Sequence, residues 1–185
     1  MQIDKSLIQR CLKNDRSAQR ELYDQIMPYL NVICRRYLYQ ESELSDVLQE
    51  SLIKIFKNLK TFDPYKAKFK TWATKIAINC CLSANEKQSK RKTQELVVPT
   101  HEVPVSPQAL QSLSDEELLR LIKLMPATYQ QVFNLAAVEE FSHAEIAEIL
   151  GISEALSRKR LTRSRAWLKE RLPNNLKVQY QRYYN

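Results

Sequence analysis

The feature that most constrains the fold of this chain is its shortage of turn-forming residues. It has one glycine and seven prolines in 185 residues. Glycine and proline mark most turns, whereas the runs of Leu, Lys, Glu, Gln and Arg that fill the chain favour helices. The apolar fraction of 44% is sufficient to build packed cores. We therefore predict an all-α fold.

Two helical blocks are predicted on either side of a connector. Residues 93–112 carry three helix-breaking prolines, Pro99, Pro104 and Pro107, and have little hydrophobic periodicity. The expected organisation is two small helical domains, 1–92 and 113–172, joined by an extended linker at 93–112 and followed by a tail at 173–185.

The first block is predicted to contain four helices. They cover residues 3–14, 17–39 and 43–59, and the last begins near Phe69 and dissolves into the basic run at 87–92. Pro28 is expected to kink the second helix or to divide it in two. The last helix is expected to bury five residues: Phe69, Trp72, Ala73, Ile76 and Cys80. A loop at 60–68 precedes it.

The second block is predicted to contain four helices as well. They cover residues 115–125, 126–137, 143–150 and 153–172. Ser114 with Glu117 and Ser142 with Glu145 have the spacing of capping boxes, in which serine and glutamate satisfy each other's backbone N–H groups. Gly151 lies between the last two helices and is expected to take a positive φ there.

The last two helices have the pattern of a helix-turn-helix. Ile146, Ala147 and Leu150 are expected to face the core from the first of them, and Ile152 to fill the corner. In the second, four residues form the inward stripe: Ser157, Leu161, Ser164 and Leu168.

The outward face of that second helix suits the major groove of DNA. Its first turn carries Ser153, Glu154 and Ala155, and its outer side carries Arg158, Lys159 and Thr162. Arg bonds guanine bidentately, while Ala and the Thr methyl can meet a thymine methyl. Arg160, Arg163 and Arg165 lie on the flanks and suit phosphates. The alternative is a surface helix that is basic without binding DNA.

The charge distribution supports the DNA-binding interpretation. The net charge is +8, with an isoelectric point near 9.3, which suggests an anionic partner such as nucleic acid. Residues 113–156 have a net charge of −6 and residues 157–185 have +8. The sign changes near the start of the last predicted helix, so the basic helix would meet phosphate while the acidic ones face away.

Other classes of function are not supported by the sequence. One glycine rules out G-x-G-x-x-G and P-loop motifs, and no nucleophile–base set is evident, so no enzyme and no cofactor are expected. Cys11, Cys34, Cys80 and Cys81 lack metal-ligand spacing; we expect reduced, buried thiols in a cytoplasmic protein and no metal. No apolar stretch is long enough to insert in a membrane.

Two segments resemble the extracytoplasmic-function σ factors of the σ70 family. LMPATYQQVFNLAAVEEFSHAEIAEILGISEALSRKRLTRSRAWL is similar to region 4, and DVLQESLIKIFKNLKTFDPYKAKFKTWATKIAIN is similar to region 2. The resemblance implies a transcription initiation factor that binds core RNA polymerase and promoter DNA. Region 4 would bind the −35 element and the β flap. Leu156 and Ser157 stand where the family more often has Thr and Val.

For region 2 the resemblance implies two surfaces. One docks on the clamp coiled coil of the largest polymerase subunit through Asp46, Gln49, Glu50 and Ile53. The other holds the melted −10 element through eight residues: Tyr65, Lys66, Lys68, Phe69, Lys70, Trp72, Lys75 and Asn79. Tyr65 is the freer aromatic, whereas the spacing of Phe69 and Trp72 favours core packing.

Two questions stay open in the sequence. An autonomous helix-turn-helix regulator, with a sensing or dimerisation domain in the first block, is the alternative function. It predicts tight duplex binding without polymerase. The sequence also leaves open whether an anti-σ factor or another DNA-targeting complex controls the chain, and what the linker and the tail tyrosines Tyr180, Tyr183 and Tyr184 do.

Overall fold

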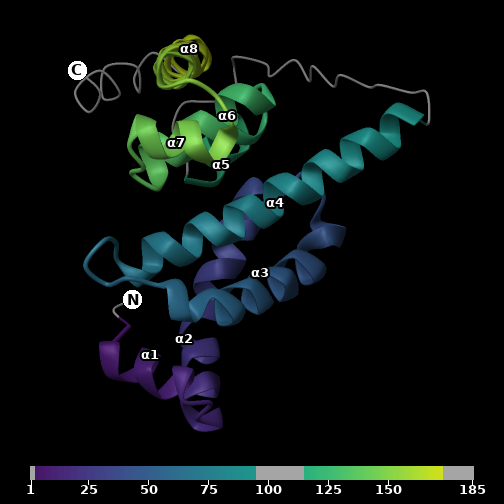
Figure 1. Ribbon diagram of the computed structural model, residues 1–185. Coiled ribbons are helices and arrows are strands. Elements are labelled where there is room, and N and C mark those ends of the chain that lie inside the picture. Colours follow the sequence, from purple (N-terminus) through teal and green to yellow (C-terminus); the bar gives the residue numbers. More distant parts are fainter. Residues whose placement is uncertain (1–2, 95–114, 173–185) are drawn as a thin grey trace. The chain divides into compact units, whose positions relative to one another are not determined.

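The computed structural model describes residues 3–94 and 115–172, and within these two ranges the chain forms helices and no strand (Figure 1). Contacts divide the chain into two compact units, residues 1–99 and 100–185, and each is described by itself. The all-α prediction is confirmed. No helix in the described ranges combines the length and apolar character that crossing a membrane requires.

The first unit is built from four α-helices, close to the predicted bounds. They are α1 (Lys5–Leu12), α2 (Arg16–Tyr37), α3 (Leu44–Asn58) and α4 (Phe69–Gln94), with short 3₁₀ turns η1 (Glu41–Glu43) and η2 (Leu59–Thr61) around α3. Helices α2, α3 and α4 all pack against one another, and α1 packs on α2. The core therefore lies where these three longer helices meet.

Two details of the predicted helices differ in the structure. Of the two outcomes expected at Pro28, a kink or a division of the helix, the division does not occur, because α2 is one helix of 22 residues. Pro28 is exposed, so the carbonyl that its missing N–H leaves unbonded can be hydrated. Helix α4 also continues through the basic run to Gln94, two residues into the predicted linker. An ion pair of 2.8 Å between Glu86 and Lys90, one turn apart, supports this extension.

The buried face of α4 is wider than predicted. Phe69, Ala73 and Cys80 are buried as expected, whereas Trp72 and Ile76 are half-buried. Three apolar residues that the prediction left out are also buried: Ala77, Ile78 and Cys81. The reason is that α4 packs against both α2 and α3, so the side chains that face each of these helices are covered.

A buried asparagine joins α4 to the end of α2. The Asn85 side-chain amide donates to the Tyr37 carbonyl at 2.8 Å, and its oxygen accepts from the Tyr39 backbone N–H at 3.1 Å. Asn85 is 6% exposed. It therefore satisfies the backbone where α2 ends and the chain turns towards α3.

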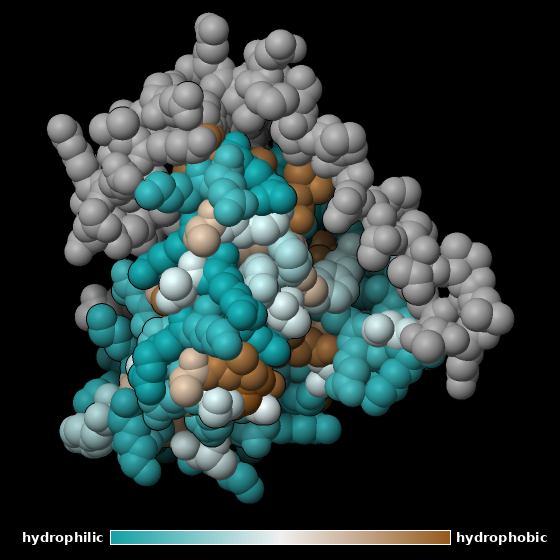
Figure 2. Space-filling model, turned by 90° about the horizontal axis from the view of Figure 1, so that it is seen from above, coloured by the Kyte–Doolittle hydropathy of each residue, from teal (hydrophilic) through white to brown (hydrophobic). Residues whose placement is uncertain are grey.

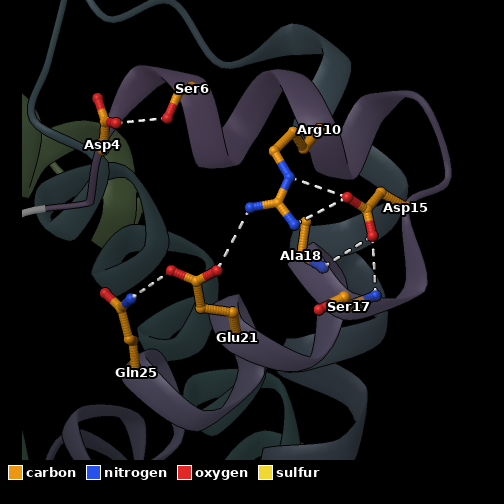
Figure 3. Close-up of polar contacts among 8 residues, drawn as sticks. All are labelled: Asp4, Ser6, Arg10, Asp15, Ser17, Ala18, Glu21 and Gln25. Carbon is orange, nitrogen blue, oxygen red and sulfur yellow. Dashed lines mark hydrogen bonds and ion pairs between the residues drawn. The ribbon is translucent and has the colours of Figure 1, made fainter.

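Helices α1 and α2 are joined by an arginine (Figure 3). The Arg10 guanidinium lies 2.8 Å from Asp15 and 3.6 Å from Glu21. Asp15 also caps α2 by accepting from the backbone N–H groups of Ser17 and Ala18. The hydrogen bond from Ala18 and the Arg10 charge both lower the pKa of Asp15. The Asp15 carboxylate thus caps the start of α2 and also pairs with α1 through Arg10.

The second unit contains the helices predicted for it. They are α5 (Asp115–Lys123), α6 (Ala127–Phe133), α7 (His143–Leu150) and α8 (Glu154–Arg171). Helix α6 packs on α8. The first predicted capping serine, Ser114, lies outside the described residues, as do Pro99, Pro104, Pro107, Tyr180, Tyr183 and Tyr184.

The predicted helix 126–137 is interrupted. Regular α-helix ends at Phe133 and continues as the π-helical turn η4 (Asn134–Val138). Backbone N–H groups of Glu139 and Phe141 then bond Asn134 and Leu135 carbonyls at 3.0 and 2.9 Å. Glu140 has φ of 59°, an uncommon value for a residue other than glycine. A π-helical turn holds more residues than an α-helical turn, and the spacing of apolar residues in the sequence does not predict where one occurs.

The predicted burial of the cysteines is confirmed. All four thiols are free and buried, and burial raises the pKa of the Cys11 and Cys80 thiols. The face drawn in Figure 2 is largely hydrophilic, with hydrophobic residues in small separate patches. Ile53, Tyr65 and Leu156 are among the large apolar side chains that are exposed in the described residues.

Candidate nucleic-acid interfaces

The helix-turn-helix of the second unit has the predicted turn. Both hydrogen bonds of the capping box are present: Ser142 Oγ accepts from the Glu145 backbone N–H, and the Glu145 carboxylate accepts from the Ser142 backbone N–H at 2.8 Å. Gly151 has φ of 62°. The Ile152 N–H then donates to the Ala147 carbonyl at 3.1 Å. This left-handed residue ends α7 and turns the chain into α8.

A hydrogen bond between side chains connects the two helices of the motif. The His143 Nδ1 lies 2.8 Å from the hydroxyl of Ser157, which is 0% exposed. Burial lowers the pKa of His143, and the charge of nearby Arg158 adds to this effect. The neutral imidazole ring is therefore favoured. The hydrogen bond to Ser157 also helps to set the rotation of α8 relative to α7.

The faces of α8 follow the prediction. Ser157, Leu161, Ser164 and Leu168 are buried, and Ile146 of α7 is buried beneath them. Ala147, Leu150 and Ile152 are half-buried. The predicted DNA-binding residues Ser153, Glu154, Ala155, Arg158, Lys159, Thr162 and Arg163 are exposed, whereas Arg160 and Arg165 are half-buried. The two half-buried arginines flank the outer face, as expected.

The start of α8 is organised by its own side chains. Ser153 caps the helix by accepting from the Leu156 backbone N–H at 3.2 Å. Glu154 and Arg158, one turn apart, form an ion pair of 3.2 Å. The Thr162 hydroxyl donates to the Arg158 carbonyl at 3.1 Å. Several polar groups of the outer face are thus already engaged within the helix.

In the first unit, a cluster of aromatic rings closes the loop between η2 and α4. Phe62 lies at the start of the loop and contacts Phe69 and Trp72 at its end, with ring centroids 5.3 and 5.4 Å apart. The Phe69 and Trp72 rings are 5.5 Å apart. Phe69 is buried, so its predicted role in packing is confirmed. Trp72 keeps part of its surface exposed.

Between these rings the loop is stabilised by Asp63. Its carboxylate accepts from the Tyr65 backbone N–H at 2.9 Å, and its carbonyl accepts from the Lys66 N–H at 3.1 Å. This turn leaves Tyr65 90% exposed. The Lys5 ammonium of α1 lies 4.7 Å from the centre of the Tyr65 ring. Lys66 and Lys68 are exposed beside it.

Helix α4 brings three predicted residues to one face. Trp72, Lys75 and Asn79 follow at i, i+3 and i+7, opposite the buried side, and Asn79 is exposed. Lys70 does not share this face. Its ammonium lies 4.7 Å from the Tyr29 ring of α2, and the Tyr29 hydroxyl bonds Thr74 at 2.7 Å. Lys70 thus adds charge on the other side of the helix.

The predicted polymerase-binding residues share one face of α3. Asp46, Gln49, Glu50 and Ile53 occur at i, i+3, i+4 and i+7, and the opposite face is buried. Ile53 is 46% exposed. Lys54 donates to Glu50 at 2.7 Å, and this bond lowers the pKa of the Glu50 carboxyl. The surface is an apolar side chain beside acidic and amide groups.

Three residues of these surfaces escaped the sequence analysis. Lys5 belongs to a different helix from the loop it contacts, and Tyr29 is 45 residues from Thr74. His143 appeared only as part of a capping box. Such contacts depend on how helices pack, and the sequence of each helix alone carries no signal for them.

Two family models match the chain. The model for Sigma-70 region 2 matches residues 22–91, and the model for Sigma-70, region 4 matches residues 115–168. The first covers most of α2, all of α3, the loop and most of α4. The second covers the second unit from α5 into α8. The matched regions contain all the surfaces described above except Lys5.

Relatives with similar sequences span nearly the whole chain. The ECF RNA polymerase sigma factor SigW of Bacillus subtilis (strain 168) is 28% identical over 181 residues, which cover 91% of this chain and 96% of the relative. The ECF RNA polymerase sigma-E factor of Haemophilus influenzae is 26% identical, with 91% and 95% covered.

Solved structures support the fold. CnrH, in complex with the cytosolic domain of CnrY, matches with a TM-score of 0.55 at 19% identity, covering 90% of this chain and 95% of CnrH. The sigma factor RpoE of Bartonella quintana, in complex with the anti-sigma factor NepR, matches with a TM-score of 0.60 at 19% identity, covering 82% and 94%.

Proposed function

Because the chain belongs to the extracytoplasmic-function group of σ70-family factors, we propose that it directs core RNA polymerase to promoters by holding two DNA elements at once. The second unit would bind the −35 element as duplex, and the first unit would bind the melted −10 strand. This activity needs no catalytic group, and it assigns the chain to the cytoplasm, where polymerase works. Its domain limits are proposed as 1–92 and 113–172.

The observation that carries the proposal is the arrangement of the first unit. An exposed aromatic and exposed lysines lie on the loop, and an exposed isoleucine lies among polar groups on α3. Single-stranded nucleic acid is bound by stacking on aromatic rings and by cations along its backbone. A DNA-binding domain that acts alone requires no such loop. This arrangement favours an initiation factor over an autonomous regulator.

For the −10 element we assign distinct tasks to the predicted residues. Tyr65, almost fully exposed, offers a ring on which an unstacked base can lie. Lys66 and Lys68 follow the strand, and Asn79 on α4 bonds a base edge, with Lys75 on the same face. Phe69 contributes indirectly, by packing under the loop. Binding the unstacked strand in preference to duplex stabilises the melted state.

For the −35 element, α8 enters the major groove and its flanking arginines contact phosphates. Docking on the polymerase is assigned to the α3 face for the clamp coiled coil, and to the second unit for the β flap. An anti-σ factor that binds and controls the chain is a further proposed partner. It is supported by the similarity to RpoE, which was solved with an anti-sigma factor.

Reconstitution tests the proposal. The full chain is mixed with core RNA polymerase, separated by gel filtration and assayed by run-off transcription on promoter fragments. We expect co-elution and promoter-dependent transcripts. Tight duplex binding by the chain alone, without co-elution or transcripts, would instead support the autonomous regulator.

A matched pair of variants tests the α3 surface. Ile53→Glu places a charge in the proposed contact and is expected to weaken binding to core polymerase at least tenfold, because a buried unpaired charge is costly. Val32→Glu is the control. Val32 is an exposed apolar residue of the same unit, 54% exposed against 46% for Ile53, and lies on α2. Equal effects of the two variants would contradict the assignment.

Permanganate footprinting tests the −10 surface, because permanganate oxidises unstacked thymines. With polymerase bound, Tyr65→Ala and Asn79→Ala are expected to lower the reactivity of thymines in the melted region while leaving co-elution unchanged. Lys13→Ala, an exposed residue just after α1, is the control for a surface substitution away from the loop and the outer face of α4. Unchanged reactivity in both test variants would remove these residues from the −10 site.

A further inference from the structure

Several polar groups on the outer face of α8 already have partners within the helix. Ser153 is used as the helix cap, Glu154 is paired with Arg158, and the Thr162 hydroxyl donates to its own helix. These contacts leave further donors and acceptors, because a guanidinium carries several N–H groups and a hydroxyl can both donate and accept. Lys159 and Arg163 are exposed as well. Hydrogen-bond readout therefore remains available on this face, and an apolar contact would add to it.

Apolar groups are exposed as well at the start of α8. Leu156 is 36% exposed in the first turn of α8, beside the exposed Ala155. The N-terminal residues of a recognition helix are the ones that contact base edges in the major groove. In that groove the apolar group is the 5-methyl of thymine. Contact with it would remove both the methyl and Leu156 from water.

The charges around Leu156 indicate DNA as its partner. Arg160 and Arg163 follow it at i+4 and i+7, on the same side of α8. An apolar side chain next to two cations fits a groove that offers methyl groups on the bases and phosphates at its edges. An apolar protein surface would leave these cations without anionic partners.

We propose that Leu156 is a specificity-determining residue of α8, which reads the 5-methyl group of a thymine in the upstream promoter element. The inference rests on the proposed binding of α8 in the major groove. It deepens that function by naming the chemical group that is read.

Deoxyuridine tests the proposal, because it pairs as thymine does and lacks only the methyl. Holoenzyme assembled from the full chain selects duplexes with about twelve random base pairs upstream of a fixed unpaired bubble, long enough for one recognition helix. Each thymine in the selected upstream sequence is then replaced by deoxyuridine, one at a time. Binding is compared for the wild type, Leu156→Ala, Leu156→Met and Leu118→Ala.

The wild type is expected to bind about fourfold more weakly when one particular thymine loses its methyl. Leu156→Ala should bind thymine and deoxyuridine equally at that position. The variant keeps the helix cap, since the Ser153 bond uses the backbone N–H. Leu156→Met should retain the preference. Leu118, on α5, is also 36% exposed and controls for loss of apolar surface.

The possible results separate the two levels of the argument. If a sequence is selected but no deoxyuridine weakens binding, or if Leu156→Ala keeps the thymine preference, the role of Leu156 is refuted and promoter recognition stands. If no upstream sequence is enriched, both the role of Leu156 and the proposed recognition by α8 are refuted.

Discussion

Replacing Asn85 with alanine should destabilise the first unit while leaving the second unchanged. Asn85 is buried and makes two hydrogen bonds to the backbone, one with the Tyr37 carbonyl and one with the Tyr39 N–H. Alanine makes neither bond. Because α4 carries Trp72, Lys75 and Asn79 on its outer face, the loss also loosens the helix that presents the proposed −10 surface.

The size of the effect follows from the burial of the two partners. A buried group that loses its hydrogen bond costs about 1–3 kcal/mol. Tyr37 is buried, so the loss of the hydrogen bond to its carbonyl should cost a free energy close to the middle of this range. Tyr39 is 49% exposed, and its N–H can bond water at lower cost. Alanine regains about 0.5 kcal/mol of helix propensity. We expect the free energy of unfolding to fall by about 2 kcal/mol.

The tryptophans allow the two units to be followed separately. Trp72 lies in the first unit and Trp167 in the second, and the chain has only these two. In a Trp167→Phe background, urea unfolding followed by fluorescence reports the first unit alone. With a slope of about 1–2 kcal/mol per molar urea, Asn85→Ala should lower the midpoint by about 1–2 M.

Asn79→Ala is the matched control. Asn79 is an exposed asparagine of the same helix, so its replacement changes helix propensity without removing a buried bond. Its midpoint should stay the same or rise slightly. If Asn85→Ala lowers the midpoint no more than Asn79→Ala does, the two buried hydrogen bonds do not stabilise the unit, and the reasoning is wrong.

Three further predictions concern the second unit, followed through Trp167. Burial lowers the pKa of His143, so the unfolded chain takes up a proton at a higher pH than the folded chain does. The stability that comes from the neutral ring should be complete above about pH 6.5 and should be lost as the pH falls through the lower folded pKa. His143→Gln should remove this pH dependence. Gly151→Ala should cost about 1 kcal/mol from the positive φ alone, since a Cβ there meets no atom within 4 Å, and an unchanged urea midpoint would contradict this. Glu140→Gly should raise the free energy of unfolding by about 0.5–1 kcal/mol, and with it the urea midpoint, because glycine adopts φ of 59° without strain. A lower midpoint would show that the Glu140 side chain stabilises the unit more than the strain of its backbone destabilises it.

Local signals predicted the helices well because they depend on neighbouring residues only. The Ser142–Glu145 capping box, the turn at Gly151 and the inward stripe of α8 all lie within a few residues of one another, and all are confirmed. The exposure of the α3 face followed from the same periodicity. The DNA and polymerase roles of these faces stay predictions, supported by the family to which the chain belongs.

The wrong predictions arose where several helices act on one segment. Trp72 and Ile76 match the spacing of a simple amphipathic helix, but α4 packs between two partners and buries Ala77, Ile78 and Cys81 instead. The π-helical turn after Phe133 breaks the period on which such counting depends. Pro28 is tolerated in α2 because its side of the helix is exposed.

By itself, the sequence determined the helical class, the order of the helices and the helix-turn-helix, because capping, turns and periodicity act over a few residues. Only the tertiary structure decided which distant side chains meet. Asn85 bonds the end of α2 across 48 residues, Lys5 lies over Tyr65, and His143 bonds Ser157. These contacts depend on the distance and rotation between packed helices, which arise from the packing of the whole core.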